Sequence, residues 1–363
     1  MRINWIIERC NEVLFGVKSE NAPLASLTAK ELDQNLSEAA RHGMLPVVME
    51  SLSGYKIDDL EKKKVVLKWY GASEQSKKNY WKRIDLMEQL ALQFKNAGLD
   101  VMFLKGATTA RLYPEPRLRV FGDIDYYMYG DSGKSVQALK DMGVETKEYF
   151  NHHTQANFKG VLLENHYDFL DRDNHHGNLL LDDELKRLAK EEGHRYPFRF
   201  ENAEADNAYS MSPTMNAIFL MRHMGIHFFS ESVALRMLYD WALFQKKYAG
   251  EVDWNKTQDL YKKSGMPAFP RMIQGILVSK LGLDMSFSSI QPICNATTDR
   301  IWQSIIESPE SNPYKKNSVR FLLYEAKVFI ANRWKHQLIF EDESYWFLFF
   351  SYTWQYLKKK IAG

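Results

Sequence analysis

Two aspartates separated by one residue, Asp123 and Asp125, are the strongest candidates for catalytic groups in the chain. The alternating pattern of residues 119–128 predicts a strand, so both side chains point to one face, about 6–7 Å apart. An Asp-x-Asp pair alone is weak evidence, because most such pairs are solvated turn residues. Paired carboxylates repel each other unless a cation neutralises them, and they can share hard cations. The pair therefore predicts a Mg²⁺ site for one or two ions.

A glycine close to this strand predicts a neighbouring phosphate site. Gly106 follows residues 100–104, a predicted buried strand, and precedes a predicted short helix over residues 107–113. Free backbone amides and the helix dipole favour an anion at such a junction. Gly122 lets a phosphate or another backbone approach closely. Together with the carboxylates, these groups predict metal-assisted phosphoryl or nucleotidyl transfer. The basic residues near in sequence are Lys105, Arg117 and Arg119.

This segment resembles the nucleotidyltransferase superfamily, whose signature is a hydrophobic strand, Gly-Gly or Gly-Ser, and a spaced Asp-x-Asp. It is more similar to an uncharacterised bacterial nucleotidyltransferase family with a Leu-Lys-Gly motif. The similarity is good over residues 99–166 and loose in the C-terminal region. Ala107 stands where the superfamily usually has a second Gly or Ser, which removes a hydroxyl contact to phosphate. The residues that carry the resemblance are Leu104-Lys105-Gly106-Ala107, Arg111-Leu112-Tyr113-Pro114, and Arg119 followed by Gly122-Asp123-Ile124-Asp125.

The resemblance implies both a fold and a set of site residues. The fold is expected to be a mixed sheet flanked by helices. Asp123 and Asp125 are expected to hold metal, and Gly106 is expected at the phosphate. In that family a later Glu-x-His on a strand commonly supplies the third acid, and Glu164-Asn165-His166 matches it. The resemblance therefore implies Glu164 as the third carboxylate.

Three further residues, His166, Arg222 and His223, are candidate substrate contacts. His166 could orient a ligand, although a structural role explains it equally well. His223 and His227 lie four residues apart on a predicted helix and therefore share a face. No Glu follows His223 to complete a zinc-protease pattern, so core or pocket histidines are expected. Arg222, beside them, could reach a phosphate from the C-terminal region.

Two pairs of adjacent histidines, His152-His153 and His175-His176, are poor chelators. Neighbouring residues on an extended segment point to opposite faces, so one pair cannot grip one ion. Both pairs are expected in loops.

Three regions with different patterning must position these residues. Residues 1–97 have apolar residues at helical spacing, with Ser26 and Thr28 as helix-start residues. Residues 98–205 hold the predicted catalytic core, and residues 206–363 a helical domain. The predicted strands are 100–104, 119–128, 161–166 and 178–181, a helix is expected to open at Asp182, and helices of the last region are expected at 215–227, 233–248 and 319–334.

These elements indicate an α+β fold, in which a nucleotidyltransferase-like core with a small mixed sheet lies between two helical regions. Arg236 and Asp240 are four residues apart on a predicted helix and are expected to form an ion pair within it.

Composition limits the setting and the partners. Of the 363 residues, 45% are hydrophobic and 26% are charged, as in globular proteins. The formal net charge is only +2, which disfavours nucleic acid as a partner without excluding it. Cys10 and Cys294 form no metal or redox motif, and a reduced, cytoplasmic chain is expected. The aromatic stretch 345–354 is too short to span a membrane.

The expected reaction is attack by an acceptor hydroxyl on the α-phosphorus of a nucleoside triphosphate such as ATP, with release of pyrophosphate. The acceptor is a small molecule or a protein. Two alternatives remain open: a catalytically silent nucleotide- or partner-binding module, such as an antitoxin, and a metal-dependent phosphohydrolase using the same carboxylates. The expected catalytic and metal-binding residues are Asp123, Asp125 and Glu164, and the expected nucleotide and phosphate contacts are Lys105, Gly106, Ala107, Arg119 and Gly122.

Overall fold

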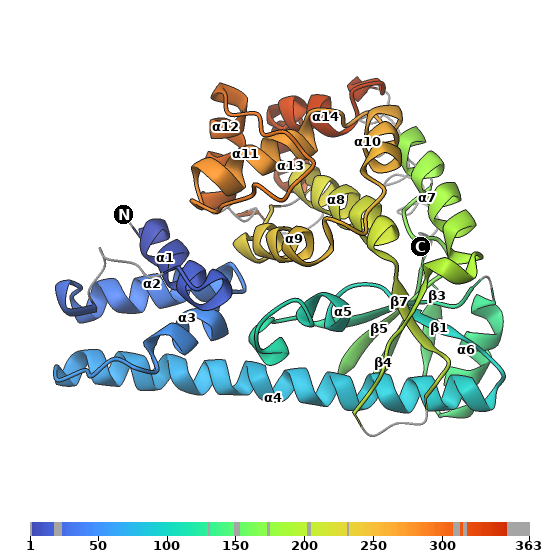
Figure 1. The fold of residues 1–363 in the computed structure, drawn as a ribbon, viewed down its shortest axis with the longest axis horizontal. Helices are drawn as coiled ribbons and strands as arrows, with labels where there is room; N and C mark the ends of the chain where they lie inside the picture. The colour runs from blue at the N-terminus through green and yellow to red at the C-terminus, as the bar shows by residue number, and fades with distance from the viewer. Residues whose placement is uncertain are drawn as a thin grey trace.

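The computed structural model shows a mixed sheet surrounded by helices (Figure 1). The sheet has seven strands in the order β3-β4-β5-β2-β1-β7-β6. Strand β2 pairs in parallel with β5, and β1 pairs in parallel with β7, while the other pairs are antiparallel. The predicted α+β class with a mixed sheet is confirmed. The structure describes residues 2–17, 24–129, 131–148, 153–172, 175–201, 205–230, 232–307, 313–314 and 318–346.

Local sequence explains where the elements begin and end. Thr28 begins α2 with a capping box, in which its side chain and that of Glu31 each bind the other's backbone amide. The strands are β1 (Val101–Phe103), β2 (Asp123–Tyr127), β3 (Thr146–Glu148), β4 (His153–Phe158), β5 (Val161–His166), β6 (Arg195–Pro197) and β7 (Ala208–Met211). The helices are α1 (Arg2–Phe15), α2 (Ala29–Arg41), α3 (Leu45–Leu52), α4 (Leu60–Asn96), α5 (Ala107–Ala110), α6 (Ser132–Asp141), α7 (His176–Ala189), α8 (Pro213–Ser230), α9 (Leu235–Tyr248), α10 (Trp254–Lys263), α11 (Phe269–Ser279), α12 (Ala296–Ile306), α13 (Val319–Ala331) and α14 (Arg333–Ile339), with short 3₁₀ helices at Leu24–Ser26, Pro116–Leu118 and Glu192–His194.

Helix α4 is 37 residues long and connects two parts of the molecule. In Figure 1 it runs along the lower edge of the view, below α1–α3 at one end and below the sheet at the other. Residues from its second half share a hydrophobic cluster with Val101 and Phe103 of β1. Met102, between them, lies in a different cluster with residues of α7 and α8. The sheet is therefore covered by α4 on one face and by α7 and α8 on the other.

The same alternation sets the direction of the paired aspartates. Ile124 and Tyr126 of β2 belong to the cluster on the α4 side, whereas Tyr127 belongs to the cluster on the α8 side. Because successive strand residues point to opposite faces, Asp123 and Asp125 face the α8 side with Tyr127. The predicted pairing of the two carboxylates on one face of a strand is confirmed by this arrangement.

Helices from both ends of the described chain share one hydrophobic cluster. It contains residues of α1–α3 together with residues of α8, α9, α11 and α12. His42, just after α2, accepts a hydrogen bond at Nδ1 from Leu235 N, at 3.2 Å, and so caps the start of α9. Burial lowers the pKa of His42 to about 4, which keeps its ring neutral and able to accept this bond. The division into three regions stays a prediction, and the first and last of them are packed together.

One predicted strand is wrong, because residues 178–181 lie within α7. A short apolar run does not distinguish a strand from a buried helix turn. Leu181 continues with Leu185 and Leu188 at helical spacing, and all three are buried. Asp182, expected in the first turn, lies in the second, where its carboxylate accepts hydrogen bonds from two backbone amides.

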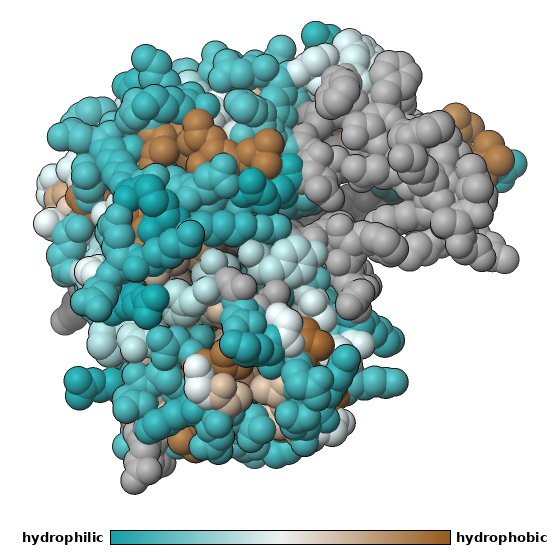
Figure 2. All heavy atoms as spheres, turned by 90° about the vertical axis from the view of Figure 1, so that its right-hand side faces the viewer, coloured by the Kyte–Doolittle hydropathy of each residue, from teal (hydrophilic) through white to brown (hydrophobic). Residues whose placement is uncertain are grey.

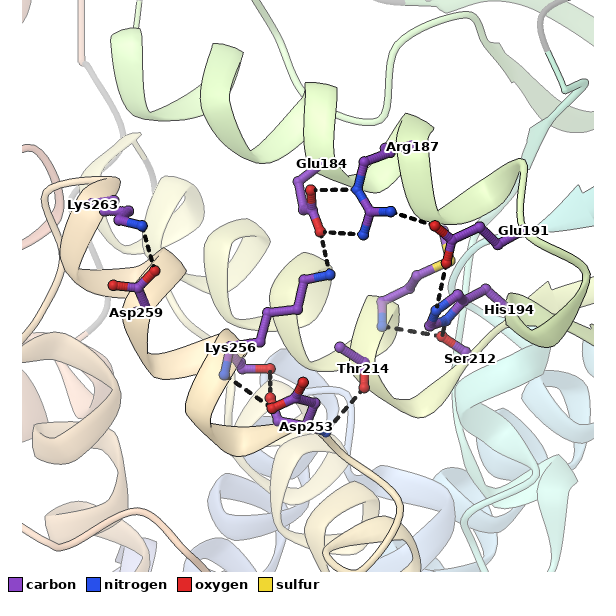
Figure 3. A network of polar contacts seen from close by, with 12 residues as sticks. Glu184, Arg187, Glu191, His194, Ser212, Thr214, Asp253, Lys256, Asp259 and Lys263 are labelled. Atoms are coloured by element: carbon purple, nitrogen blue, oxygen red, sulfur yellow. Dashed lines mark hydrogen bonds and ion pairs between the residues drawn. The ribbon is translucent and has the colours of Figure 1, made fainter.

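A network of polar contacts holds α7 against α10 and the start of α8 (Figure 3). Glu184 of α7 accepts two hydrogen bonds of 2.9 Å from Arg187 and pairs with Lys256 of α10. Thr214 of α8 accepts a hydrogen bond of 3.0 Å from the backbone amide of Asp253, which caps α10. These contacts fix the helices that cover the α8 side of the sheet.

The face shown in Figure 2 is largely hydrophilic, with hydrophobic residues in small separate groups. None of the described helices is long and apolar enough to cross a membrane. Of the aromatic stretch 345–354, residues 347–354 lie outside the described residues.

Candidate functional site

Three carboxylates meet where β2 and β5 lie side by side. The parallel pairing of these strands places Asp125 next to Glu164. Asp123, Asp125 and Glu164 each offer one oxygen, and these oxygens lie within 4.8 Å of one another. Asp125 is buried, and the other two are half-buried. The structure thus brings together the three acids that the motif and the resemblance indicated.

The two oxygens of Asp125 have different surroundings. Oδ1 lies 3.3 Å from Lys105 Nζ and 3.2 Å from His166 Nε2. Oδ2 is buried and has no hydrogen-bond partner among the described residues. A buried polar atom without a partner costs about 1–3 kcal/mol, and more if it is charged. Oδ2 is therefore a ready ligand for a cation, and the donor set of three carboxylates fits a hard divalent ion.

The charges of the site shift the pKa values of its members in opposite directions. Burial alone would raise the pKa of Asp125, but the charge of Lys105 and the hydrogen bond of His166 outweigh it and hold that pKa low. Burial would lower the pKa of Lys105, but Asp125, Asp123 and Glu164 together raise it. Burial and the charge of Asp125 raise the pKa of Glu164. The site therefore holds an ionised Asp125 beside a carboxyl group that gains a proton more easily.

Neighbours on β4 surround Glu164. Gln155 Nε2 donates to Glu164 Oε1 at 2.9 Å, and His153 Nε2 lies 3.6 Å from the same oxygen. Both side chains come from the strand that pairs antiparallel with β5. The prediction that His153 lies in a loop is wrong, because His153 is the first residue of β4. The same prediction is wrong for His176, which is the first residue of α7. His152 lies outside the described residues. The available sequence signal was the spacing of His153 and Gln155, which points both to one face of a strand.

A cavity of about 280 Å³ opens beside the carboxylates. Its walls come from Asp123 and the loop before β2, from α8, and from α9. Three basic residues, Lys105, Arg119 and Arg236, line it together with two acids, Asp123 and Asp240, and Phe121 supplies an aromatic ring. Sites for small molecules measure roughly 300–1,000 Å³, so this cavity, at about 280 Å³, is just below that range. Its position and charge suit an anion held next to the acids.

A family model described as "Uncharacterised nucleotidyltransferase" matches residues 28–273, well over half of the chain. The chain belongs to this nucleotidyltransferase family. The matched segment contains the three carboxylates and every residue of the cavity wall. The resemblance inferred from the Leu-Lys-Gly and Asp-x-Asp motifs is confirmed at the level of the family.

Two solved structures are similar to this family member. One is the solution structure of the antibiotic-resistance factor ANT(2'')-Ia, with 13% identity, a TM-score of 0.34, and coverage of 50% of this chain and 90% of that chain. The other is the crystal structure of an antigenic nucleotidyltransferase-like protein from Paracoccidioides brasiliensis, with 15% identity, a TM-score of 0.36, and coverage of 59% and 94%. No curated protein matches the sequence.

The expected phosphate cradle has a distinctive backbone at Gly106. Its φ of +68° lies in the left-handed region that favours glycine, and a Cβ there would lie 3.0 Å from the ring of Phe121. Helix α5, which follows, has only four residues, so its dipole is small. The side chain of Ala107 is buried in the cluster on the α4 side, while Gly122 is exposed and its carbonyl accepts a 2.9 Å bond from Arg83.

Arg119 is held in a buried network rather than standing free in the cavity wall. Its Nε and Nη2 donate to Asp240 of α9 at 2.8 and 2.7 Å, and its Nη1 donates to the carbonyl of Gly106 at 3.0 Å. Tyr113 donates to the same carboxylate at 2.9 Å. Asp240 thus pairs with Arg119 and not, as expected, with Arg236, which donates to a backbone carbonyl of the loop before β2.

The candidate contacts on α8 separate into two groups. His223 and His227 line the cavity, with their Nε2 atoms 3.1 Å apart. Burial, followed by the charge of Lys105, lowers the pKa of His223 well below its ordinary value. Arg222 is fully buried elsewhere, where its guanidinium donates to Asn178 at 2.7 Å and to the carbonyl of Ile339 at 2.9 Å. Successive helix residues point about 100° apart, so only the histidines reach the carboxylate side.

Proposed function

We propose that this nucleotidyltransferase-family protein is a Mg²⁺-dependent enzyme that moves a nucleoside monophosphate from a nucleoside triphosphate to an acceptor hydroxyl. The observation that carries the proposal is the meeting of Asp123, Asp125 and Glu164 beside a cavity lined by Lys105 and Arg236, with a buried oxygen of Asp125 that has no partner among the described residues. Phosphoryl and nucleotidyl transfer need this combination, because the phosphates carry negative charge and the carboxylates hold the cations that offset it.

In this proposal the three carboxylates hold one or two Mg²⁺ ions. When bound, such ions polarise the phosphate oxygens and offset the charge that develops during transfer. Lys105 and Arg236, which line the cavity, bind the triphosphate, together with the backbone around Gly106, Ala107 and Gly122. Arg119, whose charge is balanced by Asp240, is proposed to hold the backbone of Gly106 in place through the hydrogen bond to its carbonyl.

Glu164 is proposed to take the proton of the acceptor hydroxyl. Its half-buried carboxylate has an oxygen within 4.8 Å of those of Asp123 and Asp125, so an acceptor hydroxyl brought to this site would reach it. His166 and His223 are proposed to contact the substrates from the sheet and from α8 respectively. Arg222, in contrast, stabilises the packing of α7, α8 and α14.

The proposed location is the cytoplasm. Both cysteines are free, Cys10 in the core and Cys294 at the surface. Such unpaired thiols suit a reducing compartment. The acceptor is proposed to be a small molecule or a protein, since the near-neutral net charge of +2 offers no general attraction for nucleic acid.

Labelled nucleotides test the proposal. The purified protein is incubated with Mg²⁺, a cell extract as the acceptor source, and each nucleoside triphosphate labelled at the α-phosphorus or at the γ-phosphorus. Transfer gives labelled pyrophosphate from the γ-label and a labelled acceptor from the α-label, and both disappear in Asp125→Asn. The matched control is Asp259→Asn, which removes an exposed carboxylate that pairs with Lys263 on α10.

Two other outcomes would overturn the proposal. Release of free phosphate without a labelled acceptor would establish a phosphohydrolase. Tight nucleotide binding without turnover by wild type would establish a silent binding module.

A further inference from the structure

A second set of metal-ligand atoms adjoins the three carboxylates. His153, Glu164 and His166 each offer one atom, and these atoms also lie within 4.8 Å of one another. Glu164 belongs to both sets, because it is also the third acid beside Asp123 and Asp125. The second set is built by one hairpin, in which β4 and β5 pair antiparallel and place His153 directly opposite His166.

The distances in this set are close to those of a metal site. His153 Nε2 lies 3.6 Å from Glu164 Oε1, and His166 Nε2 lies 3.8 Å from Glu164 Oε2. The two imidazole rings are 5.2 Å apart between centroids. An ion with bonds of about 2.0–2.2 Å separates neighbouring ligand atoms by roughly 3–3.5 Å. Small side-chain movements therefore suffice to place one ion between the three groups.

The hydrogen bonds around the two histidines suit this role. His166 Nδ1 lies 3.3 Å from the carbonyl of Asp168. In the metal-free protein Nε2 donates to Asp125 Oδ1 at 3.2 Å. With an ion bound, the proton would lie on Nδ1 and be donated to the Asp168 carbonyl, and the lone pair of Nε2 would bind the ion. Metal-binding histidines are usually oriented by such a second bond. The amide nitrogen of Gln155 lies 3.3 Å from His153 Nε2, which leaves this nitrogen as an acceptor as well.

Gln155 supplies the competing explanation. Its amide nitrogen also donates to Glu164 at 2.9 Å, so it lies between His153 and the carboxylate. This bridge could hold the hairpin side chains together without an ion. A bound ion would instead displace the amide and take up the same two partners. The two explanations predict different metal binding, which makes them separable.

We propose that His153, Glu164 and His166 bind a transition-metal cation of the Zn²⁺, Mn²⁺ or Co²⁺ type. Imidazole nitrogens suit these ions, whereas Mg²⁺ prefers oxygen ligands. The protein then has two adjacent positions, one with oxygen ligands only and one with two nitrogens, and Glu164 connects them. The inference deepens the proposed function, on which it depends for the role of Glu164 in the carboxylate set.

Co²⁺ and Mn²⁺ are suitable probes for the full-length protein after treatment with a chelator. Equilibrium dialysis with Co²⁺ measures affinity, and pulsed electron paramagnetic resonance with Mn²⁺ detects nitrogen nuclei bound to the ion. Wild type is expected to bind Co²⁺ and to show coupling to imidazole nitrogen. His153→Gln is expected to weaken Co²⁺ binding at least tenfold, and His153→Asn serves as a second variant if the first folds poorly. Gln155→Ala is expected to keep the affinity or increase it.

Asp123→Asn is the matched control, because it changes the carboxylate set and leaves all three groups of the hairpin in place. It is expected to weaken the effect of Mg²⁺ on the unfolding temperature and to keep the nitrogen coupling of Mn²⁺. The proposal fails if the His153 variants bind Co²⁺ as wild type does, or if Mn²⁺ shows no coupling to nitrogen. Neither result affects the labelled-nucleotide experiment, so failure of this inference and failure of the proposed function are distinguishable.

Discussion

Two buried groups of charges in the described part of the chain, around Arg119 and around Asp125, are built differently. In the Arg119 group, one guanidinium faces one carboxylate, and Asp240 accepts bonds from both Arg119 and Tyr113. In the Asp125 group, three carboxylates meet, and Lys105 is the cation that contacts Asp125. The first group is electrically balanced by its own members. The second carries excess negative charge and a buried oxygen with no partner among the described residues.

This difference separates a structural from a functional arrangement. Burial of charge costs free energy that good pairing offsets, so a balanced group can be retained for the contact it makes. A group with excess negative charge keeps a repulsion that a bound cation would offset. We therefore expect substitutions in the Arg119 group to change mainly stability, and substitutions in the Asp125 group to change mainly activity and metal binding.

The largest effect is expected for Asp125→Asn. It removes a buried ligand from the carboxylate set, and nucleotidyl transfer is expected to fall at least about 10³-fold, or about 4 kcal/mol in transition-state stabilisation. Initial rates of pyrophosphate release measure it. Activity within tenfold of wild type would mean that Asp125 does not hold the catalytic ion.

Breaking the balanced group is expected to reduce stability instead. Asp240→Asn leaves Arg119 buried without its counter-charge, which costs about 3–5 kcal/mol of unfolding free energy. Urea unfolding followed by circular dichroism measures the loss. A double variant, Arg119→Met with Asp240→Leu, is expected to recover much of it, because no charge remains unpaired. If Asp240→Asn unfolds at the same urea concentration as wild type, the contrast between the two groups is wrong.

Added Mg²⁺ is expected to stabilise wild type. An ion that binds only the folded protein adds about 2.7 kcal/mol at a concentration 100 times its dissociation constant. The unfolding temperature should rise with Mg²⁺ in wild type and in Asp259→Asn. It should not rise in Asp125→Asn, and an equal rise there would place the ion elsewhere.

The smallest effect concerns the metal-free protein and pH. The pKa of Glu164 is raised on folding, so its ionised form lowers stability above that pKa, and protonation at lower pH removes the penalty. Glu164→Gln mimics the protonated group. It is expected to increase the unfolding free energy at pH 7 slightly, by less than the substitutions above change it. The gain should vanish as the pH falls below the ordinary pKa of glutamate, where the wild-type side chain is protonated both folded and unfolded.

A different pH behaviour is expected from Asp125. Its pKa is lowered, so it stabilises the protein above the ordinary pKa of aspartate and loses this contribution as the pH falls. If the gain in unfolding free energy from Glu164→Gln grew as the pH fell, the pKa of Glu164 could not be raised on folding.

A local pattern and the family resemblance together were sufficient for the acids of the site. The two-residue period of a strand placed Asp123 and Asp125 on one face, and the resemblance, through the Glu-x-His motif, implied Glu164. The predictions that were wrong concern residues whose positions depend on pairing between distant segments. His153 looked like half of a loop pair because the antiparallel pairing of β4 with β5 is not visible in its immediate neighbours.

The Arg119 network shows the same limit. Arg119 and Asp240 are 121 residues apart, whereas Arg236 stands one helical turn from Asp240 and offered the simpler pair. Tertiary packing brought α9 against the loop before β2 and replaced the local partner. Similarly, residues 178–181 became helical because Leu181, Leu185 and Leu188 bury one stripe against the sheet.

The cap that His42 places on α9 connects the N-terminal helices to a wall of the cavity. A fragment trimmed to the strands would retain all three acids, yet the opposing wall built from α9 would lose the support of α1–α3. In the isolated segment that carries the strands, the acids would then lie on an open surface instead of in a cavity. Substitutions as remote as the first helices are consequently able to alter substrate affinity without touching any atom near the acids.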